Sequence, residues 1–124
     1  MSLKTVFILS AIVAGFFALV TLLIPTTMLS WYDEESSDML VLMTRFYGAA
    51  LLAIALMAFY LKNSKLTSDV KSVVLAILIF NAVGFIVALW DQITNYTNSL
   101  GWLNVIIFLF FAVALYSVYK KKID

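Results

Sequence analysis

Apolar residues dominate four stretches of the chain, at about residues 6–25, 39–61, 70–90 and 102–119. Each stretch has roughly the 20 residues that an α-helix needs to cross the hydrocarbon core of a bilayer. Polar or helix-ending residues separate the stretches. Pro25 ends the first, a Ser-Ser-Asp triplet at residues 36–38 precedes the second, and Ser68 or Asp69 is the expected N-cap of the third. The pattern predicts four transmembrane helices.

The composition agrees with this interpretation, because 65% of the 124 residues are hydrophobic and only 12% are charged. The mean hydropathy is +1.07, and a soluble domain of this length needs more polar surface. No stretch has the composition of a linker, a low-complexity tract or a repeat. We therefore expect an all-α fold, a bundle of four transmembrane helices in which residues 1–124 form a single integral membrane domain. A cleaved signal peptide is the less favoured alternative for residues 6–25, which exceed the usual apolar length and lack a small-residue cleavage site after Pro25.

The lysines predict how the protein is oriented in the membrane. In a four-span protein all seven fall on one side, either before the first span, between the second and third, or after the fourth: Lys4, Lys62, Lys65, Lys71, Lys120, Lys121 and Lys122. The segments on the opposite side, residues 30–38 and 91–101, contain no lysine. Because lysine and arginine near span ends are retained in the cytoplasm, we expect a multi-pass protein of the cell membrane with both termini cytoplasmic.

Several classes of function are disfavoured by what the sequence lacks. Cysteine and histidine are both absent, which removes disulfides, thiolate chemistry, histidine-ligated haem, the usual zinc and copper ligand sets, and histidine proton shuttles. The net charge of +1 gives no reason to expect nucleic-acid binding. We expect no cofactor, no metal and no catalytic residue. A membrane enzyme, the third possibility, would depend on Asp91 or on loop carboxylates for acid–base chemistry.

Small and polar residues within the spans mark the expected helix contacts. Gly15 lies among alanines in the first span, and Gly48 and Ala49 follow Arg45 by three and four positions in the second. In the third span, Asn81, Gly84, Ala88 and Asp91 are spaced to share one side of a helix, and Asn104 lies near the outer end of the fourth. We expect Arg45, Asn81, Asp91 and Asn104 to be the polar site candidates, and Gly15, Gly48, Ala49, Gly84 and Ala88 to be packing residues.

Arg45 is the one charged residue placed well inside a predicted span, about 9 Å below the outer boundary. An arginine at this depth needs a partner or must extend toward the head groups. The favoured expectation is a structural ion pair with Asp91, and Asp38 is the second choice of partner. Two alternatives remain: Arg45 holds an anionic group of a lipid, quinone-like or carboxylate ligand, or it contacts another subunit.

Two further motifs carry less information. The run Asp-Glu-Glu-Ser-Ser-Asp at residues 33–38 lacks the spacing of a calcium loop, so a solvated capping turn is favoured over a metal site. Asn-Tyr-Thr at residues 95–97 matches a glycosylation sequon, although the triplet is common by chance and lies very near the expected membrane surface.

The segments RFYGAALL in the second span, NAVG in the third and GWLNV at the start of the fourth resemble those of small four-helix membrane proteins of the DoxX-like type and neighbouring uncharacterised families. The Arg-x-x-Gly pattern of that group corresponds here to Arg45 and Gly48. The resemblance implies an accessory or uncharacterised membrane protein, and some DoxX-like proteins are associated with quinone-linked oxidoreductase complexes. It does not imply a defined chemistry.

Two functional hypotheses follow. The leading one is a non-catalytic accessory or assembly subunit of a larger membrane complex, such as an oxidoreductase complex. Its expected partners are membrane lipids and other membrane subunits or further copies of the chain. The alternative is a binding protein or carrier for a small molecule, lipid or quinone-like ligand. It would have an outer-leaflet polar pocket lined by Arg45, Asn81, Asp91 and Asn104.

Overall fold

The structure is a computed structural model that describes residues 1–95 and 98–124, and these residues form five α-helices. The helices are α1 (Leu3–Leu23), α2 (Pro25–Trp31), α3 (Asp38–Leu61), α4 (Ser68–Thr94) and α5 (Leu100–Tyr119). All except α2 are long and apolar enough to cross a membrane. The prediction of an all-α protein with four apolar, membrane-length helices is therefore confirmed.

The short helix α2 is an element that the apolar pattern does not predict. The first long helix ends at Leu23, and Pro25 takes the first position of α2. Proline suits this position because the first amides of a helix have no intrahelical acceptor. A single proline thus ends the first membrane-length helix and begins a second helix of seven residues.

The helices α3 and α4 begin with side-chain caps of the expected kind. Ser37 accepts a hydrogen bond from the Leu40 amide at 3.1 Å, within the predicted Ser-Ser-Asp triplet. In α4 the cap is Thr67, which accepts from the Val70 amide at 3.2 Å, rather than Ser68 or Asp69. Each cap satisfies one of the unpaired amides at a helix start.

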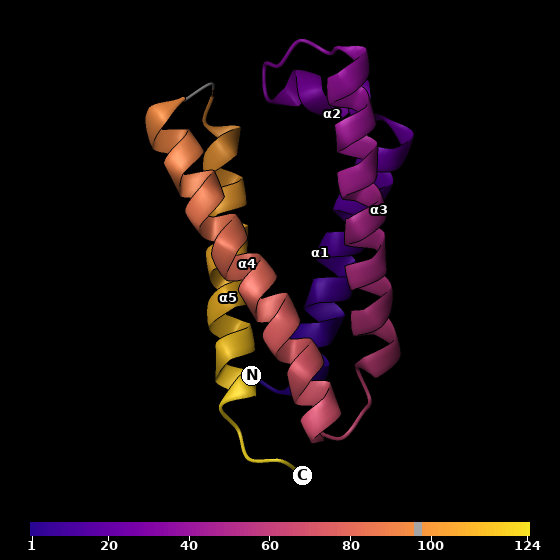
Figure 1. The fold of residues 1–124 in the computed structure, drawn as a ribbon, viewed down its shortest axis with the longest axis vertical. Helices are drawn as coiled ribbons and strands as arrows, with labels where there is room; N and C mark the ends of the chain where they lie inside the picture. The colour runs from indigo at the N-terminus through magenta and orange to yellow at the C-terminus, as the bar shows by residue number, and fades with distance from the viewer. Residues whose placement is uncertain (96–97) are drawn as a thin grey trace.

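The long helices form two antiparallel pairs, α1 with α3 and α4 with α5 (Figure 1). The pairs approach each other at the end of the molecule that carries both chain termini and diverge toward the end that carries α2 (Figure 1). We call these the narrow end and the wide end. This divergence determines where a cavity forms between the pairs.

Apolar packing at the narrow end joins the two pairs. All four long helices contribute to one buried cluster: Leu3, Val6, Phe7, Ala58, Leu66, Val70, Val74, Ile77, Phe111, Ala114, Leu115 and Val118. Phe7 and Leu115 are completely buried within it. Lipid chains are as apolar as these side chains, so close van der Waals packing, more than exclusion from water, holds the helices together here.

Polar contacts reinforce the narrow end at its surface. The Lys121 Nζ donates to the Met1 carbonyl oxygen at 2.6 Å, and the Lys71 Nζ donates to the Lys121 carbonyl oxygen at 2.9 Å. The Leu66 amide donates to the Asp124 Oδ2 at 2.8 Å. These bonds join the segment before α1, the α3–α4 connection and the segment after α5.

The α1–α3 pair depends on close backbone approach at Gly48. A Cβ at this position would overlap the side-chain hydroxyl of Thr21 and come within 3.0 Å of the Leu22 Cγ. Thr21 is 1% exposed, and its hydroxyl donates to the Phe17 carbonyl oxygen at 2.7 Å, so it has little room to move. By contrast, a Cβ at Gly15 would meet Ala55 Cβ at an ordinary 3.9 Å.

We expect Gly48→Ala to destabilise the protein by about 1–2 kcal/mol, because overpacking exceeds the gain in helix propensity. Gly15→Ala is the matched control and should be neutral or slightly stabilising, since its methyl group has space. The measurement is thermal unfolding of both variants in the same mild detergent. A Gly48→Ala variant as stable as Gly15→Ala would contradict the close approach of α1 and α3.

Candidate functional site

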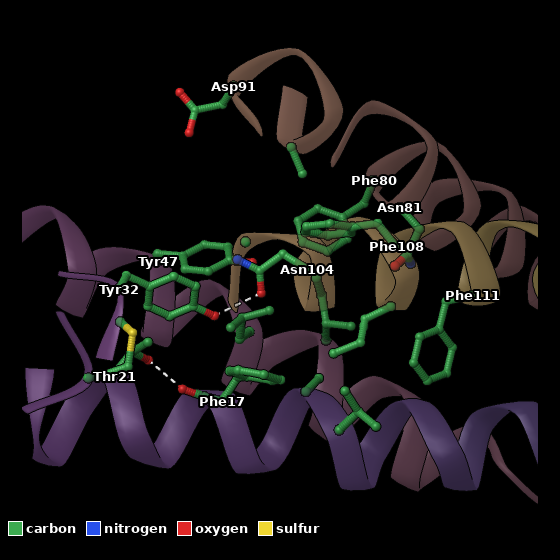
Figure 2. A pocket seen from close by; sticks show the side chains of 18 of the residues that line it. Phe17, Thr21, Tyr32, Tyr47, Phe80, Asn81, Asp91, Asn104, Phe108 and Phe111 are labelled. Atoms are coloured by element: carbon green, nitrogen blue, oxygen red, sulfur yellow. Dashed lines mark hydrogen bonds between the residues drawn. The ribbon is translucent and has the colours of Figure 1, made fainter. Parts of the chain in front are cut away.

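A cavity of about 330 Å³ lies between the two helix pairs, above the apolar cluster of the narrow end. All five helices contribute to its wall, which is mainly aromatic and aliphatic (Figure 2). Its apolar lining includes Phe17, Leu51, Ile54, Phe80, Phe108 and Phe111. Phe80 and Phe108 pack edge to face with ring centroids 5.9 Å apart. The volume is at the small end of the range for ligand sites in proteins.

A side-chain hydrogen bond between Tyr32 and Asn104 joins the two halves of the molecule at the wide end. The Tyr32 hydroxyl, just after α2, donates to the Asn104 Oδ1 on α5 at 2.9 Å (Figure 2). Burial raises the pKa of the Tyr32 phenol above its ordinary value, so this hydroxyl stays protonated and able to donate across the neutral range. Both residues line the cavity, so their bond lies at its wide end.

A second set of polar contacts supports the same end. The Asn98 Nδ2 donates to the Trp31 carbonyl oxygen at 2.9 Å and to the Asp33 Oδ2 at 3.1 Å. The buried Gln92 donates in turn to the Asn98 carbonyl oxygen at 3.0 Å. The segment after α2 is thereby connected to the α4–α5 connection through Asn98.

Asn81 places an amide in the apolar wall of the cavity. Its side chain is 7% exposed and lines the cavity halfway along α4. The Nδ2 donates to the Ile77 carbonyl oxygen of the same helix at 2.9 Å. Among the described residues, the Oδ1 accepts no hydrogen bond. The Oδ1 in the cavity wall is thus available to a donor from outside the protein.

Ser10 on α1 is a second polar group whose hydrogen-bonding capacity is unused. It lines the cavity, is 5% exposed, and its Oγ has no hydrogen-bond partner among the described residues. Several other hydroxyl side chains of the long helices donate to a carbonyl oxygen about one turn back, as do Thr21, Thr44, Ser72, Thr94 and Ser117. Leaving a buried hydroxyl unpaired costs about 1–3 kcal/mol.

The charges around the cavity are acidic and lie at its wide end. Glu34 and Asp91 are exposed and contribute to its lining, and Asp91 points away from the aromatic side chains in Figure 2. None of the lysines, and not Arg45, lines the cavity within the described parts of the chain. The interior therefore offers uncharged hydrogen-bonding groups rather than a counter-ion for an anion.

The position of Arg45 differs from the prediction. Arg45 is exposed, and within residues 1–95 and 98–124 it forms no ion pair with Asp91 or Asp38. The buried side of α3 passes through Thr44 and Gly48, four positions apart, whereas Arg45 precedes Gly48 by three. At about 100° per residue, Arg45 lies some 60° from the line through Gly48. An exposed arginine this near the start of α3 can extend toward the head groups.

Most of the other predicted site and packing residues either line the cavity or lie at contacts between helices. Asn81, Asp91 and Asn104 come together as lining residues of one cavity, although Asp91 hydrogen-bonds to the Asn95 Nδ2 at 3.3 Å rather than to Arg45. Among the small residues, Gly48 packs against Thr21, Gly84 faces the Phe108 ring, Ala88 lines the cavity and Ala49 is exposed.

Ser10, Tyr32 and Gln92 contribute to the site without having been predicted. For Ser10 a signal exists, because Ser10, Ala14 and Thr21 follow helical spacing along one side of the first span. For Tyr32 the local sequence carries none, since its partner Asn104 lies 72 residues away. Gln92 hydrogen-bonds to Asn98, six residues away across the α4–α5 connection, and no motif in the sequence marks this contact.

Two further motifs of the sequence are the acidic run at residues 33–38 and the sequon at residues 95–97. The carboxylates of residues 33–38 do not gather with others into a group able to hold a metal within the described residues. Tyr96 and Thr97 of the predicted sequon lie outside the described residues.

No protein-family model, curated protein or solved structure matches the chain.

We expect Tyr32→Phe and Asn104→Ala each to destabilise the protein, and the double variant to lose less than the sum. The shared hydrogen bond should appear as a coupling of about 0.5–1.5 kcal/mol in a double-mutant cycle measured by thermal or denaturant unfolding. Tyr60→Phe is the matched control, because Tyr60 is 73% exposed and should change little. Additive losses at Tyr32 and Asn104 would rule out the bond between them.

Proposed function

We propose that this protein binds a small, lipid-soluble molecule in the cavity between its two helix pairs, as a membrane binding protein or carrier. The observation that supports the proposal is the cavity itself, a space of about 330 Å³ with an apolar wall and a few polar groups. Sites of this kind, concave and mainly apolar with a small number of hydrogen-bonding groups, are typical of small-molecule binding.

The cavity favours binding over the accessory-subunit role, which remains the competing hypothesis. The apolar side chains exposed on the outside of α5, including Ile106 and Val113, suit lipid as well as a partner subunit. The resemblance to DoxX-like proteins is compatible with either role. A quinone-like molecule fits the proposal as one member of the lipid-soluble class.

The proposal places the narrow end in the cytoplasm and the protein in the cell membrane. Support comes from the lysines: Lys4, Lys62, Lys121 and Lys122 surround a groove at the narrow end, and positive residues are retained on the cytoplasmic side. The wide end, with Glu34 and Asp91, then faces the outside. The cavity would open in the outer half of the membrane.

We expect an uncharged alkyl probe that carries a photoreactive diazirine to label cavity residues such as Phe80 and Ile107 of the protein in nanodiscs. Ala14→Phe fills part of the cavity, since Ala14 lines it, and should reduce this labelling several-fold. Ala53→Phe adds the same volume on an exposed part of α3 and should leave the labelling unchanged. Peptide mass spectrometry measures both.

An excess of the same molecule without the diazirine should also suppress labelling of the unmodified protein, which tests the site independently of any variant. Labelling confined to lipid-facing residues, and insensitive to Ala14→Phe and to competitor, would overturn the proposal. If the protein gave this labelling pattern and also co-purified stoichiometrically with another membrane protein, the accessory role would be favoured instead.

The orientation has its own test, which uses the absence of cysteine from the chain. We expect a single cysteine at the exposed Ser36 to react with a membrane-impermeant maleimide on intact cells. A cysteine at the exposed Asn63 should react only after permeabilisation, because the positive-inside rule places the α3–α4 connection in the cytoplasm. The reverse pattern would contradict the proposed orientation.

A further inference from the structure

The charge distribution of the cavity restricts the ligand that it accepts. A carboxylate or phosphate would meet the acidic side chains of Glu34 and Asp91 at the wide end and no lysine or arginine among the described lining residues. Burying an anion without a counter-ion is strongly unfavourable in an apolar medium. A cation would gain from the acidic groups at the wide end, but Asp91 lies nearly three helical turns from Asn81 along α4. The interior therefore favours an uncharged molecule.

The unpaired Oδ1 of Asn81 favours a molecule that carries a hydrogen-bond donor. Its own Nδ2 is already engaged with the Ile77 carbonyl oxygen at 2.9 Å, and this bond fixes which end of the amide is free. Asn81 lies halfway along α4, which runs from Ser68 to Thr94, and so at mid-depth in the membrane. At this depth lipid offers a hydroxyl no hydrogen-bond partner. An acceptor in the cavity wall therefore strongly favours a ligand with a hydroxyl over one without.

Ser10 supplies the complementary group on the facing helix pair. Its Oγ is buried and has no partner among the described residues, and the residue lines the same cavity. Rotation about its Cα–Cβ bond would turn the hydroxyl toward a ligand without breaking an existing hydrogen bond. A hydroxyl on a ligand can donate to the Asn81 Oδ1 and also accept a hydrogen bond, which is the pair of roles that these two side chains leave open.

We infer that the ligand of this cavity is an uncharged lipid-soluble alcohol or phenol, whose hydroxyl donates to the Asn81 Oδ1 and whose apolar part lies against Phe80 and Phe108. This inference rests on the proposed function and narrows its ligand class. It also replaces the earlier expectation of an anionic group held by Arg45, because Arg45 lies outside the cavity.

The experiment is a competition series in nanodiscs, with a diazirine-bearing dodecanol as the photoprobe and labelling at Phe80 and Phe108 as the signal. The competitors are dodecanol, dodecyl methyl ether and ionised dodecanoate. The amount of each in the bilayer is given per lipid molecule, so that differences in partitioning between water and bilayer cancel. Dodecanol should compete at about three- to tenfold lower concentration than the ether, which lacks only the donor. Dodecanoate should be the weakest of the three.

Asn81→Leu should abolish the difference between alcohol and ether, because leucine offers no acceptor at this position. Ala53→Phe, on the exposed part of α3, is the control and should keep the difference. Ser10→Ala is the second variant, and it should reduce the preference for the alcohol to a smaller extent. Equal competition by alcohol, ether and carboxylate, with cavity labelling preserved, overturns the inference and leaves the proposed function standing. Absence of cavity labelling by every probe overturns both.

Discussion

The packing of the four long helices against one another at the narrow end is the constraint on which the other features of the molecule depend. In a bilayer, apolar side chains gain little by leaving lipid for protein, so helices associate where their surfaces fit closely. Between the two helix pairs, this fit is found in the cluster around Phe7, Val74 and Leu115. Because the two pairs diverge above this cluster (Figure 1), a cavity between them is a direct consequence of where the close packing ends.

The polar residues inside the spans follow a related rule. In hydrocarbon a hydroxyl must find a partner nearby, and Thr21 and Thr44 do so by donating to carbonyl oxygens of their own helices at 2.7 Å. Ser10 keeps a buried hydroxyl without a partner, Asn81 keeps an unpaired carbonyl oxygen, and both residues line the cavity. Unpaired polar groups in a protein interior need an explanation, and the proposed ligand would provide one.

The parts of the fold that depend on composition and length could be predicted from the sequence, whereas those that depend on helix rotation could not. Twenty-residue apolar stretches specify membrane helices almost irrespective of their order. Asn81 and Asp91, which share one helix, both line the cavity. The position of Arg45 differs from the expectation because it lies on the side of Gly48 opposite to Thr44 and Leu51, which are buried. A spacing of three residues from Gly48 does not by itself decide which side of α3 a residue takes. Tyr32 escaped prediction since its partner Asn104 lies 72 residues away.

The two ends of the molecule are held together by interactions of different kinds, and this difference bears on how a ligand would reach the cavity. At the narrow end the pairs share many van der Waals contacts among buried side chains, and such contacts add up to a large total. At the wide end the described connections between the halves include the Tyr32–Asn104 bond and the Asn98 bonds to Trp31 and Asp33. Each is worth only about 0.5–1.5 kcal/mol net. Because these bonds are directional and few, they resist separation of the pairs less than the packing at the narrow end does. The wide end also carries the cavity's acidic groups, so an anion that approached from this end would meet like charge.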